Sequence, residues 1–196
     1  MKESGSALTP FLRSDALGAL LAELMREPRP ELSLAELARR AGLSQPLVHK
    51  EVGRLAEAQV VVDRRDGRNR LVRANDKHPL FGPMRELIEA TYGPMPVLRA
   101  SLADVPGIDR AFIYGSWAER RSGVEGPPPA DIDLLVVGKV SRRALAEAAA
   151  RAGAELGVPV NPTRVGARDW GSPDPSPFLA TVRERPLIEV TGFRNE

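Results

Sequence analysis

Apolar positions in the first third of the chain recur every three or four residues, which predicts helices. The first helix is expected over residues 11–25, with Thr9 as its N-cap and Pro10 as its first helical residue. A second helix is expected to begin at Ser33, because Glu36 three residues later completes a capping box. The chain therefore opens with two short helices separated by a proline-containing turn.

The third expected helix shows a clear division between an apolar and a polar face. Ser44 is its N-cap, after Gly42 has ended the preceding helix. Val48, Val52 and Leu55 fall at i, i+4 and i+7, so they form one buried stripe. The opposite face then carries polar and basic side chains, namely Gln45, His49, Lys50 and Arg54.

The hydrophobic period changes from helical to alternating after residue 60. The runs VVVDRR and RNRLVRA are typical of two strands, and Asp66-Gly67 between them predicts a tight hairpin. Residues 76–105 return to helical spacing, with an interruption at Gly93-Pro94. They are too apolar for a free linker, so a helical connector that packs on one or both neighbouring domains is expected.

The second half of the chain begins with two apolar runs, IDRAFIYG and DIDLLVVG, which predict strands. Ser141 caps an alanine-rich helix that ends at Gly157. The run VPVNPTRV predicts a further strand, and its two prolines favour an edge or bulged position. FLATVRERPLIEV is then expected to form a helix followed by a strand.

Composition narrows the class of protein. A hydrophobic fraction of 42% and a charged fraction of 28% are typical of a globular rather than a disordered chain, and 196 residues suffice for two small domains. The absence of cysteine excludes disulfides, zinc–thiolate sites and thiol nucleophiles. MKESGSALTP lacks the apolar core of a signal peptide, and no run approaches the length of a membrane span. A cytoplasmic protein without membrane partners is expected.

Local charge says more about partners than the formal net charge of +2 does. Between Ser44 and Asn75 there are seven Lys and Arg residues against four Asp and Glu residues. Residues 106–196 hold twelve of each sign. A basic patch is therefore expected in the N-terminal half alone.

The segment SLAELARRAGLSQPLVHKEVGRLAEAQVVVDRRDGRNRLVRA resembles the winged helix-turn-helix domains of bacterial repressors over nearly its whole length. The resemblance implies double-stranded DNA as partner, with the third helix in the major groove and the hairpin on phosphates or in the minor groove. It also implies a homodimer, for which the apolar helices at 11–25 and 84–104 offer surface. Ordinary solvated charges, or a winged helix that binds protein, are the alternatives. The candidate DNA-binding residues are Ser44, Gln45, His49, Lys50, Arg54, Arg64, Arg65, Arg68 and Arg70.

Two carboxylates sit among strand-forming apolar residues near the middle of the chain. Asp131 and Asp133 alternate with Ile132 and Leu134, so both acids share one face of the strand at about 7 Å. Carboxylates so close repel each other unless a cation lies between them, and Mg²⁺ prefers oxygen ligands. Gly115-Ser116 follows the preceding strand, so its backbone N–H groups and hydroxyl are able to approach a phosphate. Arg120, Arg121, Arg142 and Arg143 are candidates for phosphate contact or for a solvated face.

This region resembles the signature of the polymerase-beta-like nucleotidyltransferase superfamily. The signature consists of an apolar residue, Gly-Ser, a spacer and an Asp-x-Asp with apolar flanks. Tyr114-Gly115-Ser116 and Asp131-Ile132-Asp133-Leu134 carry the match, within residues 106–166. The resemblance implies that Gly115 and Ser116 bind the phosphates of a nucleoside triphosphate. It implies that Asp131 and Asp133 are catalytic and hold two Mg²⁺ ions, with transfer of a nucleoside monophosphate and release of pyrophosphate.

Two features depart from this signature. The spacer of fourteen residues between Ser116 and Asp131 is long and contains Gly-Pro-Pro-Pro. The family's third acid, on the strand after the helix, corresponds to Asn161, which has no negative charge and cannot accept a proton. Asp169 is able to replace it only if the chain folds back. Binding of nucleotide and Mg²⁺ with slow or absent transfer is therefore the hypothesis for this site.

The expected fold class is α+β, with a winged helix-turn-helix domain over residues 1–75, a helical connector over 76–105 and a small mixed-sheet nucleotidyltransferase-like domain over 106–196. The expected function is a DNA-binding transcriptional regulator whose second domain binds Mg²⁺ and a nucleoside triphosphate. The alternative is an active enzyme that modifies a small molecule or protein, with the winged helix as its partner-binding module. A weaker alternative is an antitoxin-like partner of another protein.

Overall fold

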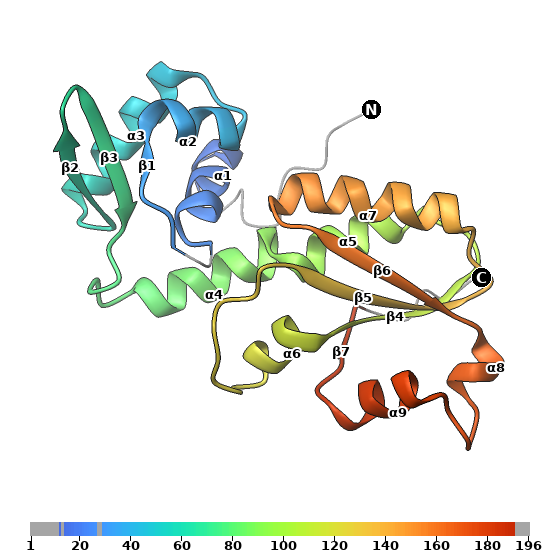
Figure 1. Cartoon of the computed structure of the whole chain (residues 1–196). Coiled ribbons are helices and arrows are strands. Elements are labelled where there is room, and N and C mark those ends of the chain that lie inside the picture. The colour runs from blue at the N-terminus through green and yellow to red at the C-terminus, as the bar shows by residue number, and fades with distance from the viewer. Residues whose placement is uncertain (1–11, 13, 27–28, 191–196) are drawn as a thin grey trace. The chain divides into compact units, whose positions relative to one another are not determined.

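The computed structural model of the chain describes residues 12, 14–26 and 29–190, and it divides into two compact units, Met1–Gly93 and Pro94–Glu196 (Figure 1). The expected connector over residues 76–105 is split between the units, because its first helix belongs to one and its second to the other. The expected helix start at Thr9-Pro10 lies outside the described residues.

Among its described residues, the first unit combines a small antiparallel sheet, ordered β1-β3-β2, with four helices. Its elements are α1 Asp15–Leu24, β1 Leu32–Ser33, α2 Leu34–Ala41, α3 Gln45–Glu57, β2 Val61–Asp66, β3 Asn69–Ala74 and α4 Phe81–Tyr92. Apolar residues from every one of these elements form a single core. Leu20 and Leu24 of α1, Leu37 of α2, and Val48 and Val52 of α3 are fully buried in it.

Side-chain caps set the helix boundaries of the first unit. The Ser33 hydroxyl accepts a hydrogen bond from the backbone N–H of Glu36 at 3.2 Å, which confirms the helix start predicted there. The Glu36 side chain does not return to Ser33 and instead binds arginines on its own helix, so only half of a capping box forms. Gly42 ends α2 in the left-handed conformation with φ +66°.

The hairpin between β2 and β3 lies one residue later than Asp66-Gly67 predicts. Asp66 pairs with Asn69, so the two loop residues are Gly67 and Arg68. Gly67 has φ +57°, and a glycine at the first loop position is typical of a type II′ turn. The tip of the hairpin therefore presents Arg68 to solvent.

The second unit is built on a mixed four-stranded sheet with the order β6-β5-β4-β7. Its elements are α5 Pro94–Leu102, β4 Ile108–Tyr114, α6 Gly115–Arg121, β5 Ile132–Gly138, α7 Arg142–Leu156, β6 Val160–Val165, α8 Ala167–Trp170, α9 Pro177–Glu184 and β7 Ile188–Glu189. Strands β5 and β6 run parallel because α7 connects them, whereas β4 is antiparallel to both of its neighbours. The edge position expected for β6 is confirmed.

Helices cover both faces of this sheet (Figure 1). Ile132, Leu134 and Val136 of β5 pack in a core shared with α5 and α7. Leu135 and Val137 point to the opposite face and pack in a second core shared with α8 and α9. By the alternation of a strand, Asp131 and Asp133 lie on this second face.

In the part of the chain that the structure describes, every helix is too short or too polar to cross a membrane.

Candidate nucleic-acid interface and acidic site

Helix α3 buries one face and exposes the other as its sequence predicts. Val48, Val52 and Leu55 are buried in the core of the first unit. The predicted contact residues Gln45, His49, Lys50 and Arg54 are all exposed. Ser44 occupies the N-cap position, yet its exposed hydroxyl makes no capping hydrogen bond. That hydroxyl therefore remains available to a ligand at the N-terminal end of α3.

Arg54 is partly neutralised by an acid on its own helix. Its guanidinium donates to Glu51 Oε1 at 2.9 Å. The side chain of Glu51 is 11% exposed, against 41% for that of Arg54. Glu51 thus lies under the exposed surface and holds Arg54 against α3.

Four of the five arginines of the β2–β3 hairpin are predicted DNA contacts, and they differ in their surroundings. Arg64 forms a two-pronged ion pair with Glu31, with Nε 2.9 Å from Oε1, and this hydrogen bond lowers the pKa of Glu31. Arg70 donates to Asp63 Oδ2 at 2.7 Å. Arg65 and Arg68 are exposed and have no ion-pair partner among the residues that the structure describes. These two therefore carry the uncompensated positive charge of the hairpin.

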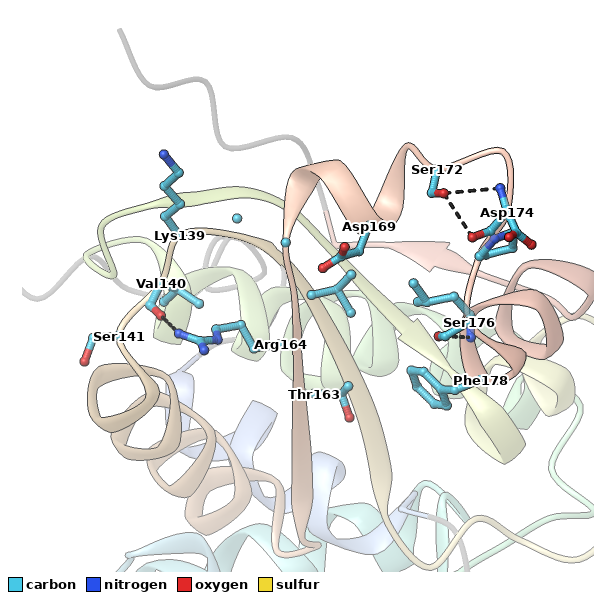
Figure 2. Close-up of a pocket in the computed structure, with 15 residues that line it drawn as sticks. Lys139, Val140, Ser141, Thr163, Arg164, Asp169, Ser172, Asp174, Ser176 and Phe178 are labelled. Carbon is cyan, nitrogen blue, oxygen red and sulfur yellow. Dashed lines mark hydrogen bonds between the residues drawn. The ribbon is translucent and has the colours of Figure 1, made fainter.

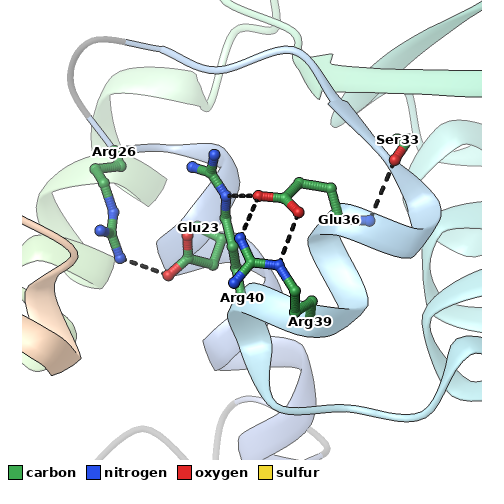
Figure 3. A network of polar contacts seen from close by, with 6 residues as sticks. All are labelled: Glu23, Arg26, Ser33, Glu36, Arg39 and Arg40. Atoms are coloured by element: carbon green, nitrogen blue, oxygen red, sulfur yellow. Dashed lines mark hydrogen bonds and ion pairs between the residues drawn. The ribbon is translucent and has the colours of Figure 1, made fainter.

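A second basic cluster, absent from the sequence prediction, lies on α2 (Figure 3). The Glu36 carboxylate accepts hydrogen bonds from Arg39 at 2.7 and 2.9 Å and from Arg40 at 2.7 Å. The bonds from Arg39 and then Arg40 lower the pKa of Glu36 to about 2, so it is ionised at neutral pH. Glu36 thus orders two exposed guanidinium groups while cancelling one of their charges. The sequence signal was a Glu three and four residues before two arginines on one helix.

The register of the second unit's sheet brings three polar side chains together. Asp133 on β5 pairs with Tyr114 on one side and with Asn161 on the other. Asn161 Nδ2 donates to Asp131 Oδ2 at 2.8 Å, across the parallel β5–β6 pair. The sequence predicts that three residues lie close together, and the structure places them so: Asp131, Asp133 and Asn161.

Gly115 lies against this group. It has φ +69°, and a Cβ atom at this position would come within 2.5 Å of Asp133 Oδ2. Any other residue here would therefore be strained and would displace the Asp133 carboxylate. Ser116 follows as an exposed residue in the first turn of α6. Gly115 thus lies against Asp133, and Ser116 follows it in the chain.

The electrostatics of the acidic site favour a cation. Burial raises the pKa of Asp133 above its ordinary value, the charge of Asp131 raises it further, and a hydrogen bond with Asn161 opposes both effects. Carboxylate and amide oxygens suit Mg²⁺, which also keeps several water ligands when bound. Within the described residues no third acid or histidine joins the pair. Asp169 lies on α8 and does not replace Asn161. The donor set therefore fits one ion better than two.

The spacer between Ser116 and Asp131 is held by an arginine. Its first half forms α6, and Arg120 at the end of this helix donates to the carbonyl oxygens of Val124 and Pro127, each at 3.1 Å. Arg120 therefore holds the proline-containing loop.

A pocket of about 940 Å³ lies elsewhere in the second unit (Figure 2). Strand β6, the turn between β5 and α7, and the segment from Gly166 to Leu179 form its walls. Asp131, Asp133 and Gly115 are not among its lining residues. The sequence contained no motif for this pocket, because residues from separate segments form it.

Comparison with known proteins bears on the first unit. Residues 18–70 match the family model described as the MarR family. These residues form a MarR-family winged helix-turn-helix domain. The match extends from α1 into β3, so this MarR-like domain contains α3 and every hairpin arginine discussed above.

Two solved structures are similar to parts of the chain. One is MepR, a transcription regulator of the Staphylococcus aureus multidrug efflux pump MepA, at 15% identity and a TM-score of 0.36, over 42% of this chain and 63% of MepR. The other is the transcriptional regulator BldR from Sulfolobus solfataricus, at 20% identity and a TM-score of 0.36, over 50% of this chain and 68% of BldR. The chain thus spans less than two thirds of MepR. A search of curated proteins found no match.

The acidic site predicts a specific dependence of stability on pH. Because the pKa of Asp133 is raised on folding, its ionised form destabilises the folded protein above that pKa, and this cost disappears once the group is protonated in both states. We expect Asp133→Asn, a neutral side chain of similar shape, to increase the free energy of unfolding near pH 7 without divalent cations. The difference should shrink as the pH falls towards about 3.5. Urea unfolding of both proteins at several pH values measures it.

Asp109→Asn is the matched control, because Asp109 is an exposed carboxylate on β4 of the same sheet. It should change the urea midpoint little at any pH. An Asp133→Asn protein no more stable than the native chain near pH 7 would contradict the electrostatic account of this site.

Proposed function

We propose that this protein is a DNA-binding transcriptional regulator of MarR type whose C-terminal unit binds a nucleoside triphosphate with Mg²⁺. The observation that carries the first part is the MarR-family match over residues 18–70. The convergence of Gly115, Asp131, Asp133 and Asn161 supports the second part.

The proposed DNA contact uses the exposed face of α3 and the hairpin. Gln45, His49 and Lys50 lie in the first half of α3, where a helix in the major groove presents side chains to base edges. Ser44 adds a hydroxyl free of any capping bond. Arg65 and Arg68 are free of ion pairs within the described residues, so their charge is available to DNA phosphates. Each of the other three arginines, Arg54, Arg64 and Arg70, must release its acidic partner before it can bind a phosphate.

This proposal predicts a change in the salt dependence of DNA binding. In Arg65→Ala/Arg68→Ala, affinity for a duplex should fall, and the slope of log K against log salt should decrease by about 0.9 for each lost phosphate contact. Glu31→Gln should act in the opposite direction, because it releases Arg64 for phosphate. Fluorescence anisotropy with a labelled duplex at several salt concentrations measures both effects.

Arg143→Ala is the matched control, since Arg143 is an exposed, ion-paired arginine of the second unit. Its affinity and salt slope should equal those of the native protein. If the hairpin variants behave like this control, the hairpin does not contact DNA and the proposed interface is wrong.

We also propose that the chain acts as a homodimer. Leu80, just before α4, is 57% exposed and Leu87 within α4 is 45% exposed, and both belong to the first unit. Contiguous exposed apolar patches mark interfaces between proteins, and we propose that these two leucines belong to such a patch. Leu80→Glu/Leu87→Glu should convert a dimer to a monomer in size-exclusion chromatography with light scattering. A monomeric native protein at micromolar concentration would exclude the dimer.

For the nucleotide, the acidic pair is proposed to hold Mg²⁺, and Gly115-Ser116 the phosphates that the ion bridges. The bound ion would neutralise both carboxylates and polarise the phosphate oxygens. Asn161 orients Asp131 by donating to it, but an amide cannot take a proton from an attacking hydroxyl. The residues present therefore support binding better than transfer, and active nucleotide transfer is the less favoured function.

Calorimetry with MgATP and MgGTP tests this part of the proposal. Native protein should bind at least one of them, and Asp131→Asn/Asp133→Asn should weaken binding more than about 100-fold, because changes outside the ligand shell alone cost about 10–100-fold. Asp104→Asn/Asp109→Asn removes two exposed carboxylates from the same unit and should bind normally. Equal binding by both double variants would exclude the acidic site, and rapid pyrophosphate release would refute the binding-only function.

A further inference from the structure

The 940 Å³ pocket of the second unit (Figure 2) shares a strand with the acidic site, although the acids do not line it. Strand β6 connects the two. Asn161 pairs with Asp133, Thr163 with Leu135 and Val165 with Val137. Leu135, Val137 and Val165 belong to one core, so these alternate residues of β6 share the face that carries the acids.

Along this face β6 passes from the acidic site into the pocket. Asn161 binds Asp131, whereas Thr163 and Val165 line the pocket. Alternate residues of a strand are about 7 Å apart. Thr163, which lines the pocket, is therefore one two-residue repeat along β6 from Asn161 of the acidic site. The Tyr114 and Thr163 hydroxyls lie 3.2 Å apart, and Tyr114 is the β4 neighbour of Asp133. The two sites are thus parts of one surface.

Phe178 gives the pocket an exposed aromatic ring. It lies in the first turn of α9, lines the pocket and is 43% exposed. Tyr114 contacts the ring edge-to-face, with centroids 5.9 Å apart and an interplanar angle of 80°. A ring that is supported on one side and open to the pocket is suited to stacking on a flat ligand.

The lining of the pocket also offers hydrogen-bond acceptors. Asp169 and Asp174 line it, and neither carboxylate accepts a hydrogen bond from the described residues. Such acceptors suit the N–H groups on the edge of a nucleobase. The pocket volume lies within the range of about 300–1,000 Å³ found for small-molecule sites.

We propose that this pocket holds the nucleoside part of a purine nucleoside triphosphate, with the base stacked on Phe178 and the phosphates directed along β6 to Asp131 and Asp133. This inference rests on the proposed function, because it adds a base subsite to the proposed Mg²⁺-phosphate site. A purine is favoured over a pyrimidine because its larger ring covers more of Phe178.

Calorimetry on the full chain separates the base subsite from the phosphate site. The probes are MgATP, MgGTP, MgCTP, MgUTP and Mg²⁺-tripolyphosphate, which has phosphates but no base. Phe178→Ala should bind the preferred purine nucleotide about tenfold more weakly, a loss of the size found when an aromatic partner of a base is removed. Its affinity for tripolyphosphate should be unchanged, and Phe178→Tyr should retain nucleotide affinity.

Glu155→Ala is the control, because Glu155 is an exposed residue of α7 that does not line the pocket. Its nucleotide affinity should be native. Circular dichroism of each variant establishes that it is folded.

Each of the other outcomes overturns the inference. Unchanged nucleotide affinity in Phe178→Ala, or equal losses for nucleotide and tripolyphosphate, excludes a stacking role. If the native protein binds tripolyphosphate as tightly as it binds every nucleotide, the base subsite is excluded. The proposed phosphate site then remains. No binding of any probe overturns the proposed nucleotide function together with the subsite.

Discussion

The register of β5 between β4 and β6 is the constraint on which the second unit depends. Leu134 and Leu135 are both fully buried, one in the core on each face of the sheet. A shift of one residue would exchange the faces and turn the acids into an apolar core, so this register is strongly specified. This register holds Asp133 between Tyr114 and Asn161. The raised pKa of Asp133 means that its ionised form destabilises the folded state, and burial of the apolar residues of β5 offsets this loss of stability.

In the MarR-like domain, many arginines of the proposed DNA surface are paired with acids. This pairing explains why the net charge is small although the surface is rich in arginine. Arg54, Arg64 and Arg70 each have an acid within hydrogen-bonding distance, and Glu36 engages two arginines of α2. Exposed ion pairs of this kind contribute little to stability. Their effect is to position the guanidinium groups and to lower the net charge of the surface around the hairpin.

Asn161 links the geometry of the acidic site to the proposed role of the second unit. Its amide relieves repulsion between two carboxylates by donating to one of them, and it adds no charge of its own. A third carboxylate would increase affinity for cations and provide a proton acceptor. Under the proposed function, this arrangement therefore suits nucleotide binding better than nucleotide transfer.

Local patterns in the sequence determined most of the secondary structure. Caps at Ser33 and Ser141, the left-handed glycines at positions 42 and 157 and the hydrophobic period of α3 act over one or two helical turns, so neighbouring residues suffice to predict them. The motif spacing likewise predicted that the Gly-Ser turn and the Asp-x-Asp strand come together, and Gly115 lies against Asp133. The hairpin loop was displaced by one residue because the pairing of β2 with β3, rather than Asp-Gly alone, sets its position.

Contacts between distant residues were decided only by the tertiary structure. The order β6-β5-β4-β7 depends on which strand edges pair, and the bond from Asn161 to Asp131 follows from that pairing. The partners of Arg64 and Arg120, and the pocket beside Phe178, likewise require segments to be brought together by folding. The sequence by itself thus determined the elements and the chemistry that they carry, because these follow from short-range periodicity and capping. Tertiary packing alone decided which charges are free and where a ligand has room, because these depend on non-local burial.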